Sequence, residues 1–201
     1  MKQILQFTSY ILHPVFILLY GAILYFYSTN NYFDYLTTYI YLLQILVISI
    51  FIPLAILYFL ITIRKVDSVM IYNVSQRKIP LLVQTIIILI LMNFVVEHEH
   101  LISLYLYYAA LLVSCIISLF LVFLKQKASL HMVGITSLLG YCVVLQLFFS
   151  TTNTILISIL IALIGIVASS RLYMKAHTYL ELWLGFLIGL LPQISLLVYF
   201  L

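Results

Sequence analysis

Long apolar stretches recur along almost the whole of this chain and are separated by short polar segments. Hydrophobic residues make up 66% of the 201 positions, and charged residues only 7%. A soluble domain carries about 25% charged residues, so this chain lacks the polar surface that a soluble fold of its size needs. Because about 20 apolar residues cross a bilayer as a helix, we expect an integral membrane protein. The two cysteines, Cys115 and Cys142, lie inside apolar stretches and are expected to be buried hydrophobes.

The spacing of the apolar residues is helical, and no alternating strands are evident. This pattern predicts an all-α polytopic membrane bundle of about seven transmembrane helices, in a single domain over residues 1–201. The first helix is expected to bend or break at His13-Pro14. The predicted spans are Ile4–Phe26, Tyr39–Ile63, Leu81–Val96, Leu101–Leu124, Met132–Phe149, Thr154–Ser169 and Tyr179–Leu201.

Seven spans place alternate loops on opposite faces, and the charges divide between these faces. One face has the acidic residues Asp34, Glu97 and Glu99 and no basic residue. An excess of Lys and Arg marks the cytoplasmic side of a membrane. We therefore expect the N-terminus and the basic loops in the cytoplasm and the C-terminus outside. All the basic residues fall on the predicted cytoplasmic face: Lys2, Arg64, Lys65, Arg77, Lys78, Lys125, Lys127, Arg171 and Lys175.

The loop before the last span carries residues suited to phosphate chemistry. His177 and Glu181 are four residues apart, so on a helix they share a face and can form a hydrogen bond. A carboxylate that holds one imidazole nitrogen leaves the other free to attack or to take a proton. The guanidinium of Arg171 suits phosphate oxygens. The alternative is a set of ordinary interfacial residues, with Arg171 and Lys175 reaching the lipid headgroups.

Two other loops on the same face add cations, a second histidine and a serine. Together the three loops supply what a phosphate monoester or diphosphate site needs, because cations neutralise the phosphoryl group while one histidine attacks and another protonates the leaving oxygen. The added residues are Arg64, Lys65, Arg77, Lys78, Lys125, Lys127, Ser129 and His131.

These motifs resemble the signatures of the type 2 phosphatidic acid phosphatase superfamily. Ser170-Arg171, His177 and Glu181 keep the spacing of its third signature, with Glu in place of Asp. Ser129-Leu130-His131 is similar to its second signature, with Leu in place of Gly, and Arg77-Lys78-Ile79-Pro80 is a loose version of its first. The resemblance covers about residues 60–195 and implies a six-helix phosphatase-like core plus one further helix.

The resemblance implies hydrolysis of a lipid phosphate or diphosphate, either phosphatidate-like or polyprenyl-diphosphate-like, without metal or cofactor. His177 would be the nucleophile that forms a phosphohistidine, Glu181 would orient it, and His131 would protonate the leaving group. The residues expected to hold the phosphate are Arg171, Arg77, Ser129 and one of the lysines Lys65, Lys78 and Lys127.

Departures from the family pattern keep a second function open. Leu130 replaces a glycine that would allow close backbone approach to the phosphate, and the first signature lacks its lysine. A degenerate member that binds a phosphorylated lipid, or takes part in its transport, without hydrolysing it is therefore the alternative. Members of this superfamily generally present the site to the periplasm or exterior, whereas the basic residues here predict the cytoplasmic side, most simply of a bacterial inner membrane.

Three further patterns have simpler interpretations. Glu97-His98-Glu99-His100 is expected to be a solvated turn and not a metal site, because neighbouring side chains point to opposite sides. Gly185 and Gly189 predict a face where two helices pack closely. The cations are few and lie next to apolar stretches, so no nucleic-acid partner is expected. The expected partners are bilayer lipids and a phosphorylated lipid substrate.

Overall fold

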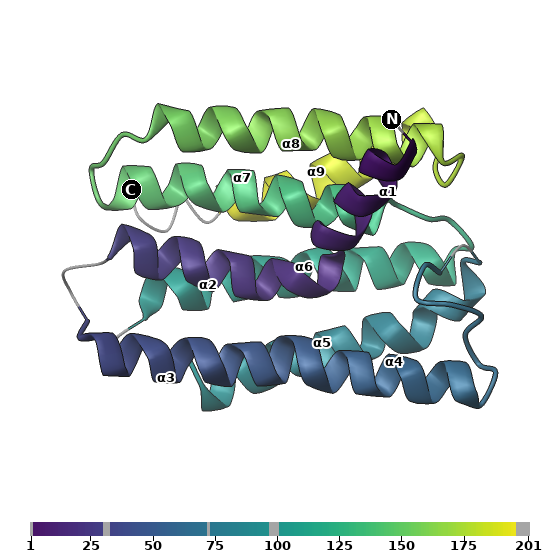
Figure 1. The fold of residues 1–201 in the computed structure, drawn as a ribbon, viewed down its shortest axis with the longest axis horizontal. Coiled ribbons are helices and arrows are strands. Elements are labelled where there is room, and N and C mark those ends of the chain that lie inside the picture. Colours follow the sequence, from purple (N-terminus) through teal and green to yellow (C-terminus); the bar gives the residue numbers. More distant parts are fainter. Residues whose placement is uncertain (1, 30–32, 72, 97–100, 196–201) are drawn as a thin grey trace.

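The computed structural model describes residues 2–29, 33–71, 73–96 and 101–195, and in these ranges it is a helical bundle without strands (Figure 1). The all-α prediction is confirmed for this part of the chain. The α-helices are α1 (Lys2–Ile11), α2 (Ile17–Ser28), α3 (Tyr35–Leu46), α4 (Ile52–Thr62), α5 (Lys78–Phe94), α6 (Ile102–Phe123), α7 (Leu130–Phe148), α8 (Thr154–Tyr173) and α9 (Tyr179–Ser195).

Five helical segments are long and apolar enough to cross a membrane, as expected of an integral membrane protein. The predicted total of seven is not reached within the described residues, because two further apolar segments, Pro14–Ser28 and Tyr179–Ser195, are shorter. The first predicted span is shortened by its break, and the described part of the last ends at Ser195. The five long segments are Tyr35–Thr62, Ser75–Phe94, Ile102–Phe123, Leu130–Phe148 and Thr154–Tyr173.

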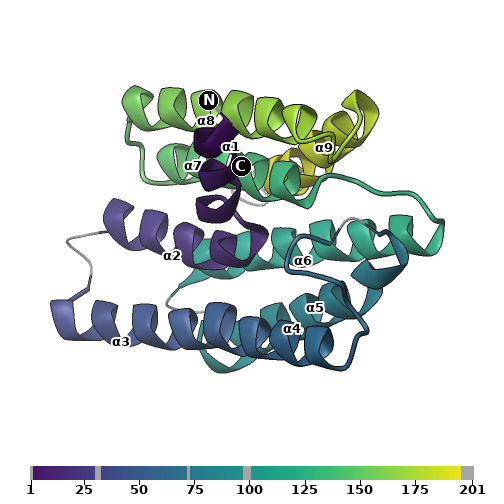
Figure 2. The same ribbon diagram turned by 45° about the vertical axis from the view of Figure 1, so that its right-hand side comes forward.

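The first predicted span is interrupted at His13-Pro14. Helix α1 ends at Ile11, and a 3₁₀ turn, Pro14–Phe16, leads into α2. The Nδ1 atom of His13 accepts a hydrogen bond of 3.3 Å from the backbone N–H of Val15, which caps this turn. Pro14 has no N–H and suits the first position of the turn. As a result α1 does not continue the line of α2 but crosses one end of the bundle beside α7 and α8 (Figures 1 and 2).

Helix α7 is the centre of the bundle, and α9 packs closely along it. Most side chains of α7 are buried, in contrast to those of the outer helices. Gly185 and Gly189 of α9 permit this approach, since a Cβ atom at Gly185 would lie 2.6 Å from the carbonyl oxygen of Ser129. At Gly189 it would fall on the backbone of Val133. The predicted close-packing face is confirmed, and it fixes where α9 begins relative to the start of α7.

Buried tyrosines join α6 to the start of α2. Tyr107 and Tyr108 are almost fully buried, and their hydroxyls donate to the carbonyl oxygens of Ile17 (2.8 Å) and Leu18 (3.2 Å). The ring of Tyr107 stacks on Tyr141 of α7, with centroids 4.3 Å apart. A buried hydroxyl needs a hydrogen-bond partner in an apolar core. The backbone carbonyl oxygens of Ile17 and Leu18 can accept from the tyrosines because each has a second lone pair.

Helices α3 and α4 form one long outer rod that contains a π-helical turn, Val47–Phe51. Pro53 follows this turn and has no N–H to donate to the preceding turn. Such π-helical turns are frequent at functional sites. This rod lies beside α5 in the bundle (Figure 1).

Candidate functional site

The three basic loops meet at one end of the bundle, where α1 also crosses (Figure 1). The Nη1 atom of Arg77 donates to the carbonyl oxygen of Ala128 over 3.0 Å, which joins the first loop to the second. Lys127 in the second loop donates through Nζ to the carbonyl oxygen of Ala176 in the third, over 3.1 Å. Stretches of chain that are far apart in sequence therefore share one polar cluster.

His177 and Glu181 form a short side-chain hydrogen bond between the third loop and the first turn of α9. The Nδ1 atom of His177 lies 2.7 Å from Oε2 of Glu181, and Lys127 Nζ lies 3.6 Å from the same oxygen. Glu181 is in the first turn of α9 and also accepts from the backbone N–H of Thr178 at 3.3 Å. The four-residue spacing thus produces the predicted contact.

The surroundings of His177 keep its imidazole neutral. Burial lowers the pKa of His177 to about 4, and Arg77 and Lys127 act in the same direction, whereas the Glu181 hydrogen bond raises it. A neutral ring that donates Nδ1–H to a carboxylate carries its lone pair on Nε2. This is the form of histidine that can act as a nucleophile or a base.

Arg171 and His131 are both joined to Ser9 of α1. The Nη2 atom of Arg171 donates to Ser9 Oγ and lies 3.3 Å from the sulfur of Met174. The Nε2 atom of His131 lies 3.1 Å from the Ser9 carbonyl oxygen, and Ser9 Oγ is 2.8 Å from Ser170 Oγ. Sequence reasoning gave Ser9 no role, because nothing local shows that α1 folds across the ends of α7 and α8.

His13 is a second residue that sequence reasoning left outside the site. Its ring meets that of His131 edge to face, with centroids 5.4 Å apart, and both histidines line one cavity. The sequence predicts only a helix break at His13-Pro14. No signal in the sequence placed it here, because the predicted span Ile4–Phe26 sets His13 near the middle of the membrane and not at the basic end.

Arg77 and Ser129 are buried and hold the loops in place. Arg77 is 7% exposed, and its Nε and Nη2 atoms donate to the carbonyl oxygen of Ile71 at 3.1 and 2.8 Å. Ser129 donates its backbone N–H to the Glu181 carbonyl oxygen at 3.0 Å. Its hydroxyl is buried and has no hydrogen-bond partner among the described residues.

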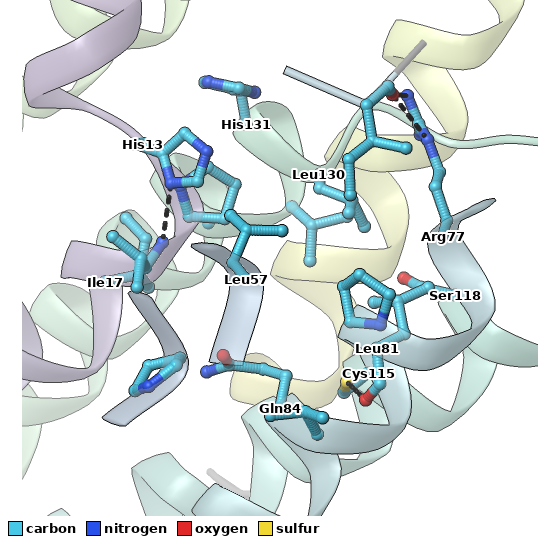
Figure 3. Close-up of a pocket in the computed structure, with 18 of the residues that line it drawn as sticks. His13, Ile17, Leu57, Arg77, Leu81, Gln84, Cys115, Ser118, Leu130 and His131 are labelled. Atoms are coloured by element: carbon cyan, nitrogen blue, oxygen red, sulfur yellow. Dashed lines mark hydrogen bonds between the residues drawn. The ribbon is translucent and has the colours of Figure 1, made fainter. Parts of the chain in front are cut away.

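One cavity of about 190 Å³ is lined by part of the predicted site (Figure 3). Four of the candidates line it: Arg77, His131, Arg171 and His177. The remaining candidates lie beside it or elsewhere. Glu181, Lys127 and Ser129 support the lining residues through the contacts described above. Lys65 is exposed after α4, and the Lys78 ammonium lies over the ring of Phe123, 5.0 Å from its centroid.

The deeper wall of the cavity is apolar and comes from several helices. Leu18 of α2, Leu57 of α4, Leu81 of α5 and Leu111 of α6 all contribute to it. Within the described ranges, no group of three His, Cys, Asp or Glu side chains could hold a metal ion. The Glu97–His100 turn lies outside the described residues. The arrangement thus joins a cationic, histidine-bearing mouth to a chamber suited to hydrocarbon.

Known proteins provide no relative from which a family could be assigned: no family model, no curated protein and no solved structure matches this chain.

Proposed function

We propose that the protein is a membrane phosphatase that hydrolyses a lipid phosphate or diphosphate through a phosphohistidine. One observation carries the proposal: His131, His177, Arg77 and Arg171 line a single cavity whose deeper wall is apolar. The two guanidinium groups suit the phosphate of a substrate, and the apolar wall suits its hydrocarbon tail. The resemblance of the three loops to phosphatase signatures agrees with this reading.

In the proposed reaction, Nε2 of His177 attacks the phosphorus atom, and an N–P bond forms as the bond to the leaving oxygen breaks. His131, in its protonated form, gives a proton to that oxygen from the ring nitrogen that does not face Ser9. Water then attacks the phosphohistidine, His131 takes a proton from that water, and inorganic phosphate leaves. Glu181 holds Nδ1–H throughout and stabilises the positive charge that develops on the His177 ring.

A second candidate function is binding of a lipid phosphate without hydrolysis. Ser9 already contacts both Arg171 and His131, and Arg77 donates to two backbone carbonyls, so these donors are engaged in the resting protein. A binding protein needs only that the anion replaces these contacts. A hydrolase also needs His177 and His131 to act on one phosphorus atom.

Phosphate release from phosphatidate and a polyprenyl diphosphate by the purified protein in detergent distinguishes the two functions. We expect turnover that His177→Asn lowers by about a thousandfold, since the nucleophile is removed. His98→Asn, in the turn predicted on the opposite face, is the matched control and should retain activity. Turnover that survives His177→Asn, or none with either substrate, would reject the mechanism. An acid-labile, base-stable phosphoryl label on His177 would support it directly.

The proposed location is a bacterial inner membrane, with the basic end of the bundle in the cytoplasm. A reporter fused to the C-terminus should then be active only on the outer side. A cytoplasmic signal from that fusion would reject this orientation without affecting the chemistry of the site.

A further inference from the structure

Gln84 is a polar exception in the apolar part of the cavity. It lines the cavity from α5, in the company of Leu81, Ile88 and Leu57 (Figure 3). Its side-chain amide has no hydrogen-bond partner among the described residues. The other polar side chains of the lining each have at least one, from His13 and Ser114 to the residues of the mouth. Gln84 is half-buried, so its amide stays accessible in the cavity, and a ligand that enters can accept a hydrogen bond from it.

The position of Gln84 relative to the mouth is set by α5. Arg77, Leu81 and Gln84 are spaced by four and three residues and lie on the cavity side of this segment. Seven residues of helix correspond to a rise of about 10 Å, and long side chains lean back toward the helix N-terminus. Along the axis of α5, the amide of Gln84 therefore lies within about 10 Å of Arg77. It is farther from the basic end than the charged side chains, but closer to it than the part of the cavity lined only by apolar residues.

A lipid phosphate with acyl esters places a carbonyl at this depth. In a phosphatidate-like lipid the ester carbonyls follow the phosphate by a few bonds, where an amide N–H can donate to them. In a polyprenyl phosphate or diphosphate the chain begins directly after the phosphate oxygen and offers no acceptor. The same amide would then remain unpaired against hydrocarbon, which disfavours that substrate.

We propose that Gln84 is a specificity-determining residue that donates to an ester carbonyl, so that the substrate is an acyl-ester lipid phosphate and not a polyprenyl one. This inference rests on the proposed function for the identity of the headgroup. It deepens that proposal, because the charged mouth alone accepts either class.

The test compares a diacyl phosphatidate with its dialkyl ether analogue of equal chain length, which lacks only the carbonyls, and with a polyprenyl phosphate. Purified protein in detergent is assayed for phosphate release and, separately, for binding of each lipid by isothermal titration calorimetry. We expect the wild type to prefer the ester over the ether about tenfold in both assays, the effect of one neutral hydrogen bond in an apolar site.

Gln84→Leu keeps the size of the side chain and should reduce this ratio to within about twofold. The matched control is Gln44→Leu, since Gln44 is an exposed residue of α3 that does not line the cavity, and it should keep the tenfold preference.

Equal binding of ester and ether by the wild type would overturn the inference about Gln84, whether or not phosphate is released. A preference that persists in Gln84→Leu would overturn it as well. Ester-selective binding without turnover of any lipid would instead reject the phosphatase proposal and leave the role of Gln84 standing. If neither glycerolipid binds, both proposals fail.

Discussion

The two ends of the bundle hold their polar side chains in different ways. At the end where the basic loops meet, hydrogen bonds join residues far apart in sequence, such as Ser9 with Ser170, 161 positions away, and Lys127 with Ala176, 49 positions away. At the opposite end, the described polar contacts are local. Asp34 accepts from the N–H of Thr37 three positions on, and Gln146 bonds Asn153 over seven.

This difference distinguishes local contacts that cap helices from long-range contacts that assemble several loops. Local contacts satisfy the backbone at the start of a helix and carry little information about distant elements. Long-range contacts to buried Arg77 and Arg171 require that several loops fold against one another around charge, which is expensive near a bilayer. This buried charge is the reason why we propose the functional site at the basic end.

The largest expected effect comes from removing the guanidinium of Arg77. Arg77→Met leaves the carbonyls of Ile71 and Ala128 without their donors, and we expect the free energy of unfolding to fall by about 3 kcal/mol. Unfolding by denaturant in detergent micelles measures it. Lys65→Met, on an exposed side chain of the preceding loop, should change it by less than about 0.5 kcal/mol. Equal losses in both variants would remove the distinction between buried and exposed cations.

A smaller loss is expected where α9 meets α7. The Cβ atom of Gly185→Ala would lie 2.6 Å from the Ser129 carbonyl oxygen, so the helices must separate, at a cost of about 2 kcal/mol. Gly165→Ala is the matched control, since nothing lies within 4 Å of a Cβ atom there, and it should be neutral or slightly stabilising. A Gly185→Ala protein as stable as the control would show that this contact does not fix the basic end.

Acid should weaken the basic end through His177. Because the pKa of its buried imidazole is lowered to about 4 from an ordinary value near 6.5, the unfolded chain binds a proton that the folded chain does not in this pH window. Stability contributed by His177 is therefore present above pH 6.5 and is lost as the pH falls toward 4, by about 1 kcal/mol between pH 6.5 and 5.5. The measurement is the same unfolding experiment on wild type and His177→Gln, and the extra acid sensitivity must be absent from the variant. If the free energies of unfolding of the two proteins fell in parallel with decreasing pH, His177 would not be the source of the acid sensitivity.

The smallest change is expected at the opposite end. Asn153 caps α8 by accepting from the N–H of Leu156 at 3.0 Å, so Asn153→Ala should lower stability by about 0.5 kcal/mol. Phosphate release should not change, because the cap is local. A loss of activity with this variant would mean that the two ends are coupled and that the cap of α8 is not a purely local contact.

The helical class, the meeting of the basic loops and the contact between His177 and Glu181 were within reach of the sequence. Apolar periodicity, charge asymmetry and a four-residue spacing are local or cumulative signals, and each leaves a trace in the residues themselves. The same holds for Gly185 and Gly189, whose spacing predicts close helix packing.

The contributions of Ser9, His13 and Gln84 were beyond the sequence for a common physical reason. Each depends on where an element turns in space: α1 across the bundle end, the 3₁₀ turn at Pro14, and the cavity face of α5. A serine on an apolar helix, a histidine before a proline and a glutamine in a span look the same whether they face a site or a neighbouring helix. The assignment of Lys65 and Lys78 to the phosphate likewise stays a prediction, since neither lines the cavity.

The crossing of α1 places a competitor from the same chain at the proposed phosphate site. Ser9 offers a hydroxyl to Arg171 and a carbonyl to His131 from the same chain, so it is present at an effective concentration that no free anion in solution matches. A headgroup that binds the Nη2 atom of Arg171 or the Nε2 atom of His131 must exchange with Ser9. The binding free energy of a ligand at the proposed site will therefore be the difference between its own contacts and those of Ser9, and changes in α1 will alter the affinity without touching the ligand.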